Sequence, residues 1–380
     1  MSNVASASSG AIALVPLAND QHAASAGCGP TIRAVDPRRY DRHEWDSEMA
    51  RVGGSVRSTH AHLRGLSLKR PWRPTRSFAV TLVGETRPIG YFTLRRKGSV
   101  WEFYDGLRLA PEHAHRWDAA MASSLAACGP AIYRYGWTWS PEPSREAALR
   151  GIAGVEVLAT VEAVVQGIDF ANWPSWEAYR AAISQNAKRN ARKFEARLRE
   201  APVVMRRGAR SLVDLWHLVR MRREMYARKG IAFGALGALA GHLANLLACP
   251  RDGLIASVRG DERVAAIMRL VEHLETTYYF EGSHIPGEEG AAWYLTLAVL
   301  QRAYRAAPFG KFLMGFYIVG DELAEGLIRS RTSLRVTNWP TAIVTFAWQP
   351  PAAPATREPD QAALAQHDRP VPRALTPEAA

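Results

Sequence analysis

The spacing of apolar and polar positions predicts the same order of elements twice along the chain. Alternating or continuous apolar runs bounded by turn residues predict strands, and apolar positions three or four residues apart predict helices. In the first segment, three strands, a helix and a fourth strand are expected over residues 77–83, 88–95, 100–107, 116–127 and 131–139. In the second segment, the same elements are expected over residues 254–258, 264–270, 275–281, 291–307 and 311–317. The repeated order indicates a structural duplication, although the two segments share no strong residue-by-residue repeat.

A helical block separates the two segments. Helices are expected over residues 175–199 and over residues 211–228, where Gly230 marks the end of the second helix. The first helix is strongly basic and includes Arg192 and Lys193. One interpretation of these charges is a solvated face. The other is a groove for an anionic substrate, in which Arg192 and Lys193 contact the substrate.

Both ends of the chain are expected to be disordered tails. Residues 1–30 are rich in Ala, Ser and Gly, and residues 350–380 are rich in Pro and Ala, with few large apolar side chains to bury. The N-terminal end lacks the charged start and long apolar stretch of a signal peptide. Because no run of about 18 apolar residues predicts a membrane span, the protein is expected to be cytoplasmic.

Charge and composition narrow the function only a little. The chain of 380 residues has a formal net charge of +12, but only six of its 48 basic residues are lysines. A balance dominated by arginine, with abundant alanine, is typical of a GC-rich bacterial genome, so nucleic acid is not expected as a partner. Cys28, Cys128 and Cys249 lie far apart, and no residue spacing indicates a disulfide framework or a metal site. P-loop, dinucleotide-binding and serine-hydrolase motifs are absent from the sequence.

The stretch from Trp173 to Trp339 contains several short sequences in a characteristic order. A basic helix (NAKRNARKFEARLRE) precedes a helix ending near YARKG, a strand pair (LIASVRGDERVAAIMRL), a strand ending in YYFEG, a loop that opens a long helix, and a strand with FLMG. In this order the chain resembles the CelD-like branch of the GNAT acyltransferases, which is related to the FemABX peptidyl-aminoacyl transferases. Lys311 and Met314 take the positions where that branch usually has Asp and Arg around Phe-Leu.

The resemblance implies an α/β fold of tandem GNAT-like lobes, each a mixed, mostly antiparallel sheet flanked by helices. It implies an N-terminal GNAT-like lobe over residues 31–170 and a C-terminal GNAT, CelD-like acetyltransferase domain over residues 171–349. The implied activity is transfer of an acyl group, first of all acetyl, from acyl-CoA to an amine of a small molecule or sugar, without a metal, in envelope or exopolysaccharide biosynthesis. Two alternatives stay open. One is FemABX-like aminoacyl transfer from a charged tRNA, and the other is a catalytically silent binding protein that has kept the fold.

In the GNAT fold, the acyl-CoA enters between two parallel strands that separate, and a loop at a helix start binds the pyrophosphate. The nearest match to that loop implies Gly287, Gly290, Ala291 and Ala292 as cofactor-binding residues. Gly287 replaces the usual basic residue, and Glu288 and Glu289 bring two carboxylates to the expected position of the pyrophosphate. The alternative interpretation of the same residues is a plain helix start, in which the acidic side chains complement the helix dipole.

The resemblance also implies candidate catalytic residues at the strand ends of the second segment. Glu281 is the first candidate to remove the ammonium proton, and His284 is the second. Tyr317 lies in the region where many GNAT enzymes have a tyrosine that protonates the leaving thiolate. Tyr278 and Tyr279 are the candidates for contact with the substrate. For each residue the alternative is structural: a core aromatic, a solvated strand end or an exposed loop residue.

An aromatic stripe is expected on the last strand of the first segment. Tyr133, Tyr135, Trp137 and Trp139 alternate with other residues and would share one face of a strand. A core position is one interpretation, and a platform that stacks on a sugar ring is the other.

Overall fold

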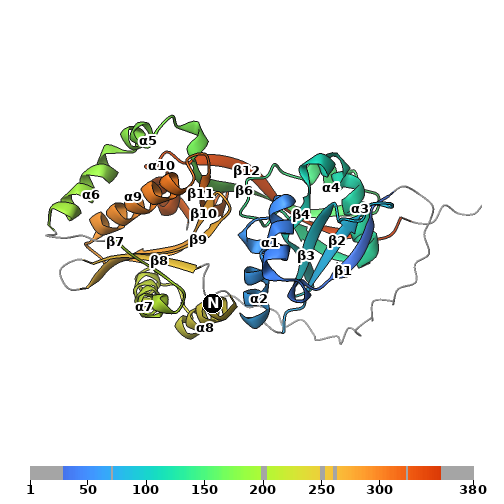
Figure 1. Ribbon diagram of the computed structural model, residues 1–380, viewed down its shortest axis with the longest axis horizontal. Helices are drawn as coiled ribbons and strands as arrows, with labels where there is room; N and C mark the ends of the chain where they lie inside the picture. The colour runs from blue at the N-terminus through green and yellow to red at the C-terminus, as the bar shows by residue number, and fades with distance from the viewer. Residues whose placement is uncertain are drawn as a thin grey trace, which may run out of the picture.

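The computed structural model describes residues 29–69, 72–197, 203–248, 253–259, 263–321 and 324–351. Both predicted tails lie almost wholly outside these residues, as do Cys28, Cys249 and the end of the predicted basic helix. The described residues form two lobes on one continuous 12-stranded sheet (Figure 1). None of the helices in these ranges is long and apolar enough to cross a membrane.

The N-terminal lobe carries helices on both faces of its strands, because alternate strand residues are apolar on each side. Residues such as Phe78, Phe92 and Phe103 pack under α3, whereas Ala79 and Tyr91 pack under α1 and α2. The strands are β1 (Thr31–Val35), β2 (Thr75–Thr81), β3 (Gly90–Lys97), β4 (Val100–Leu109) and β5 (Ala131–Tyr135), and the helices are α1 (Arg42–Arg51), α2 (His60–Lys69), α3 (Trp117–Cys128) and α4 (Glu146–Arg150).

The C-terminal lobe repeats this plan. Its strands are β7 (Val203–Arg207), β8 (Gly253–Arg259), β9 (Val264–His273), β10 (Thr276–His284) and β11 (Lys311–Ile318). Helices α6 (Gln185–Ala196) and α9 (Glu289–Ala306) lie on one face of the sheet with α5 (Trp176–Ala182), and α7 (Leu212–Arg228) and α8 (Ala235–Ala248) lie on the other (Figure 1). Helix α10 (Glu325–Thr332) follows β11.

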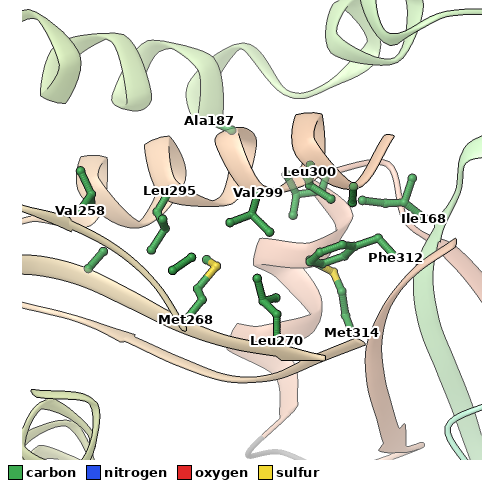
Figure 2. Close-up of a cluster of buried hydrophobic side chains, with 14 of the residues drawn as sticks. Ile168, Ala187, Val258, Met268, Leu270, Leu295, Val299, Leu300, Phe312 and Met314 are labelled. Atoms are coloured by element: carbon green, nitrogen blue, oxygen red, sulfur yellow. The ribbon is translucent and has the colours of Figure 1, made fainter. Parts of the chain in front are cut away.

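The core of the C-terminal lobe lies between α9 and the sheet. Leu295, Val299 and Leu300 of α9 point down onto Met268 and Leu270 of β9 (Figure 2). Leu295 and Val299 belong to a set of buried residues spaced four apart on one helix face, with Ala291 and Ala303. Phe312 and Met314 of β11 close the same cluster, and Ala187 of α6 covers α9 from outside (Figure 2). This packing fixes where β10 and β11 lie relative to α9.

The two lobes exchange their last strands. β6 (Val155–Asp169) follows the N-terminal lobe in sequence but pairs with β11, and β12 (Thr337–Trp348) follows the C-terminal lobe but pairs with β5. The two long strands also pair with each other, antiparallel, from Thr337↔Gly167 to Trp348↔Val155. The strand order is therefore β1-β2-β3-β4-β5-β12-β6-β11-β10-β9-β8-β7. The predicted tandem of mixed, mostly antiparallel sheets flanked by helices is confirmed.

Two predicted elements are wrong in detail. The helix expected over residues 175–199 is divided into α5 and α6, because the extended backbone at Ile183 and Ser184 lets Ser184 N–H donate to Ser333 O at 3.0 Å. The strand expected over residues 131–139 ends at Tyr135, since Gly136 adopts a φ of 93°. Trp137 and Trp139 therefore do not share a strand face with Tyr133 and Tyr135, which are core residues of the N-terminal lobe.

Candidate functional site

Strands β10 and β11 are paired over only a short stretch and then separate. Their parallel pairing runs from Thr276↔Lys311 to Tyr278↔Leu313. Beyond this point β10 has a bulge between Tyr279 and Glu281, and β11 has a bulge between Leu313 and Phe316, where Gly315 adopts a φ of 91°. Both bulges bend their strands, so the sheet opens between them.

A cavity of about 330 Å³ lies in this opening, and we call it the β10–β11 cavity. The end of β10 contributes Gly282, Ser283 and His284, and β11 contributes Phe312 and Met314. Helices α9 and α10 form further walls with Glu289, Ala292, Trp293, Thr296, Leu327, Ser330 and Arg331. Met225 of α7 also lines the cavity, so helices from both faces of the sheet contribute to its walls.

Arg331 is the one charged side chain among these lining residues that is buried, with 6% of its surface exposed. Its guanidinium donates to Gln166 Oε1 at 3.1 Å and to the carbonyl oxygen of Met314. Burial lowers the pKa of Arg331 to about 10, and the phenols of Tyr279 and Tyr317 lie near enough to oppose this shift. The side chain thus holds β11 next to β6 at the point where β11 bulges.

Two of the polar residues at the end of β10 also line the cavity. Ser283 is buried, and its hydroxyl has no hydrogen-bond partner among the described residues. His284 follows it, and burial is the main cause that lowers the pKa of its imidazole below the ordinary value. An imidazole that is neutral near pH 7 can accept a proton. His284 is therefore the predicted catalytic residue that directly lines the cavity.

Glu281 faces the other side of the sheet, toward α7 and α8. Its carboxylate forms an ion pair with Arg222 of α7 and lies 3.3 Å from Nη1 of Arg269. Nε2 of His242, on α8, lies 3.1 Å from the same carboxylate. A carboxylate held by two guanidinium groups has its lone pairs occupied, which counts against the predicted role of Glu281 as the base.

The predicted tyrosines are divided between two environments. Tyr279 lines the cavity, and its hydroxyl lies against Gly282, where an added Cβ would come within 2.6 Å of it. Tyr278 faces the opposite side, stacks on Trp139, and burial raises its pKa to about 12. Tyr317 lies on β11, near Arg331.

In the predicted phosphate loop, the groups near the expected phosphate position already interact with protein side chains. Gly287 N–H donates to Oε1 of Glu289 at 3.2 Å, and Glu288 forms an ion pair with Arg197 at 2.6 Å. Gly290 allows α9 to pack closely on α6, because an added Cβ would lie 2.7 Å from Asn190 O. Ala291 is fully buried in the core, so of the four predicted residues of the loop only Ala292 lines the cavity.

Arg192 and Lys193 lie on the exposed face of α6, and neither lines the β10–β11 cavity. Lys188 on the same helix is buried instead, where its ammonium donates to Arg180 O and Ala181 O at the end of α5. The basic helix therefore combines one structural lysine with a solvated, positively charged face.

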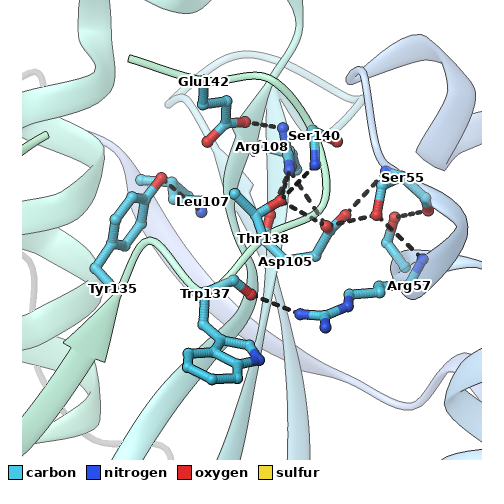
Figure 3. A network of polar contacts seen from close by, with 11 residues as sticks. Ser55, Arg57, Asp105, Leu107, Arg108, Tyr135, Trp137, Thr138, Ser140 and Glu142 are labelled. Atoms are coloured by element: carbon cyan, nitrogen blue, oxygen red, sulfur yellow. Dashed lines mark hydrogen bonds and ion pairs between the residues drawn. The ribbon is translucent and has the colours of Figure 1, made fainter. Parts of the chain in front are cut away.

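The corresponding opening in the N-terminal lobe is filled. Strands β4 and β5 pair in parallel over three residues, from Val100↔Ile132 to Glu102↔Arg134, and then separate. Beyond this point the Tyr135 hydroxyl accepts the N–H of Leu107 at 3.3 Å (Figure 3). Arg108 donates to Asp105 at 3.2 Å and Thr138 at 3.0 Å, and forms an ion pair with Glu142 (Figure 3). Side chains thus occupy the space that stays empty in the C-terminal lobe.

Sequence reasoning missed Arg331 and Ser283. A helix was not expected at α10, and Arg331 looks like the exposed Arg329 two residues earlier. The available signal was its position: Ile328, Arg331 and Leu334 are three residues apart, so the arginine interrupts an otherwise apolar helix face. Groups of His, Cys, Asp and Glu that could hold a metal are not found in the described part of the chain.

No protein-family model matches the sequence, and no curated protein matches it significantly. Solved structures do match. FemX has 8% sequence identity and a TM-score of 0.60, over 80% of this chain and 96% of FemX. A conserved protein of unknown function from Bacteroides thetaiotaomicron has 12% identity and a TM-score of 0.51, over 84% of this chain and 100% of that one. L-PGS from Bacillus licheniformis has 12% identity and a TM-score of 0.50, over 81% and 91%. The protein therefore has a GNAT-like fold related to that of the FemABX proteins.

Proposed function

We propose that the protein is an N-acyltransferase that binds its acyl donor in the β10–β11 cavity and transfers the acyl group to an amine. The observation that carries this proposal is the contrast between the two lobes. The parallel strands separate in both, but side chains fill the opening between β4 and β5, whereas a cavity of about 330 Å³ remains between β10 and β11. A ligand site of this kind is concave, mostly apolar and carries a few polar groups.

The main requirement of the reaction is that the protein positions the amine and the acyl donor. The amine nitrogen attacks the carbonyl carbon of the donor, a C–N bond forms, and the bond from carbon to the leaving sulfur or oxygen breaks. The proton that leaves the nitrogen needs an acceptor, and the leaving group needs a proton. We assign the acceptor role to His284, since it lines the cavity and burial keeps its imidazole neutral. Tyr317, which lies near Arg331 but does not itself line the cavity, is the candidate that protonates the leaving group.

Acyl-CoA is the first candidate donor, with acetyl-CoA as the simplest case and an amine of a small molecule or sugar as the acceptor. The second candidate donor is a charged tRNA, and a specific observation favours it. The carboxylate of Glu289 accepts the Gly287 N–H that a pyrophosphate would need, and negative charge at this loop repels phosphate. A tRNA-borne acyl ester needs no pyrophosphate site here.

The test compares both donors on the wild-type chain and on a variant that fills the cavity. Acetyl-CoA and a mixed aminoacyl-tRNA pool are added separately, and thermal unfolding and acyl release to a panel of amines are measured. A donor at 100 times its Kd adds about 2.7 kcal/mol to the unfolding free energy. Ala292→Trp is expected to abolish this stabilisation, whereas Ala306→Trp, at the exposed end of α9, retains it. Without stabilisation or acyl release from either donor, the protein is a silent binding protein and the proposal fails.

A further inference from the structure

Arg331 differs from Arg108, the buried arginine at the corresponding strand opening of the N-terminal lobe. Arg108 of the N-terminal lobe is 7% exposed and has two carboxylates beside it, those of Asp105 and Glu142. Arg331 is 6% exposed, yet within the described ranges no Asp or Glu oxygen lies within 4 Å of its nitrogens. Both guanidinium groups lie where parallel strands separate, but only the one in the filled opening carries its counter-ions.

The bonds that Arg331 makes to other described residues leave its charge uncompensated. Gln166 Oε1 and Met314 O are neutral acceptors, and a guanidinium has five N–H donors. A buried charge without a partner of opposite sign is strongly destabilising, so such groups are normally paired. An anion in the cavity would supply the missing charge.

Ser283 gives a second, independent indication of a ligand. Its side chain is 7% exposed, it lines the same cavity, and its hydroxyl has no partner in the described part of the chain. Buried hydroxyls are nearly always hydrogen-bonded, and an orphan one in a cavity wall indicates a missing acceptor. A guanidinium and a hydroxyl donor in one cavity are complementary to the two oxygens of a carboxylate.

The remaining walls restrict what carries that carboxylate. Met225, Ile267, Met268, Phe312 and Leu327 are apolar, and such surface favours a short alkyl chain. The one acidic side chain among the lining residues is Glu289, which is exposed and accepts the N–H of Gly287. One cation balances the single charge of a carboxylate, whereas a phosphate monoester would bring a second negative charge into the same apolar space.

We propose that the β10–β11 cavity selects an acyl group that ends in a carboxylate, with Arg331 as its counter-ion and Ser283 as a second hydrogen-bond donor. This inference rests on the proposed function, because it names the class of acyl group that the same site transfers. Donors of this class are monothioesters or monoesters of short dicarboxylic acids.

The test uses the succinyl and butyryl thioesters of N-acetylcysteamine, which have the same chain length and differ in a terminal carboxylate or methyl group. In calorimetric titration of the wild-type protein, the Kd of the succinyl ester is expected to be about tenfold lower than that of the butyryl ester. A charge-assisted hydrogen bond typically supplies this factor. Arg331→Met is expected to remove this preference, and Arg329→Met, on the exposed face of the same helix, is expected to keep it.

Ser283→Ala separates a ligand contact from a structural role. The change removes a hydroxyl that has no partner among the described residues, so the melting temperature of the free protein should not fall. The ratio of the two Kd values should decrease about threefold, because a neutral hydrogen bond contributes less than a charged one. This variant and the wild-type comparison keep the proposal testable if Arg331→Met does not fold.

Three results overturn the inference. They are equal affinity for both esters, a preference for the succinyl ester that survives in Arg331→Met, and stronger competition against the succinyl ester by inorganic phosphate than by free succinate. If the butyryl group is bound and transferred to an amine without any preference for succinyl, the proposed function stands and only the inference fails. If neither ester is bound and neither acyl group is transferred, the inference fails, and the proposed function is decided separately by the comparison of acetyl-CoA with aminoacyl-tRNA.

Discussion

Nη1 of Arg269 lies 3.3 Å from the carboxylate of Glu281, across the paired strands β9 and β10. Arg222 pairs with the same carboxylate from α7, and burial is the main cause that lowers the pKa of Arg269 to about 10. Glu281 is therefore the counter-ion of two partly buried cations. This relationship ties α7 to the sheet on the face opposite α9, and it has a direct consequence for substitutions of Glu281.

Replacement of Glu281 by Gln should destabilise the protein. The change leaves Arg222 and Arg269 without their negative partner, and breaking a buried pair typically costs about 3–5 kcal/mol of unfolding free energy. Chemical denaturation measures this loss, and Glu275→Gln, in an exposed turn, is the control with little effect. An unchanged stability would contradict this prediction. A fall in kcat/KM of about 10²–10⁴-fold with partial recovery at high pH would instead identify Glu281 as the catalytic base.

Acidification should destabilise the protein through His62. Burial is the main cause that lowers the pKa of His62 to about 3, and Nε2 lies 2.7 Å from the Tyr104 hydroxyl. The unfolded chain binds the proton below about pH 6.5, where the folded chain does not, so the unfolding free energy falls from pH 6.5 toward pH 3. The slope is about 1.4 kcal/mol per pH unit for each such histidine, and His242 contributes in the same direction.

Denaturation curves between pH 7 and pH 4 measure this slope. His62→Gln keeps a polar group opposite Tyr104 and is expected to reduce the slope by about one proton, which is the contribution of a single histidine. His115→Gln, at an exposed position, is the control that leaves the slope unchanged. An undiminished slope in His62→Gln would mean that this histidine is already protonated in the folded protein.

The loop before α9 predicts how the protein responds to CoA. Glu289→Gln removes the negative charge that accepts the Gly287 N–H, so CoA is expected to bind about two- to fivefold more tightly, the range typical of one charge at a helix N-terminus. Titration with CoA measures the change, and Glu275→Gln is again the control. Unchanged affinity would show that the phosphates of CoA do not approach this loop.

The exposed basic face of α6 predicts a different response to polyanions and to small donors. Reversal of Arg192 and Lys193 to Glu should leave the affinity for a small thioester unchanged, because neither residue lines the cavity. Binding of a mixed tRNA pool should weaken, and the slope of log K against log salt should fall by about two, one for each phosphate contact. Arg33→Glu with Arg39→Glu, at exposed sites of the N-terminal lobe, is the matched control. A weaker thioester affinity would place the donor on α6.

The order of elements could be predicted from the sequence because each predicted element has its own local period. The strand pair β8–β9 and helix α9, for example, follow directly from alternation and from three- and four-residue spacing. The exchanged strands could not be predicted in this way. β12 contains Pro340, which has no N–H to donate and which usually excludes a central strand, yet it pairs there with Val164.

The site was predictable only in part. The resemblance pointed to the end of β10, and Tyr279, His284 and Ala292 do line the cavity. The direction of Glu281 depends on the bulge between Tyr279 and Glu281, since an extra residue changes which side chains face α9. A bulge in a strand leaves little trace in the pattern of apolar residues, and strict alternation would put Glu281 and Tyr279 on the same face.

Because β6 and β12 are exchanged between the lobes, the N-terminal lobe can be completed only near the end of translation. Strand β5 is complete at Tyr135, but its partner β12 does not leave the ribosome until residue 348 has been made. At about 5–20 residues per second, this leaves the edge of β5 without its neighbour for roughly 10–40 s. An open strand edge is a template for pairing with other chains. The N-terminal lobe is therefore most exposed to aggregation while the C-terminal lobe is still being translated, and a chain interrupted before β12 would leave both lobes unfinished.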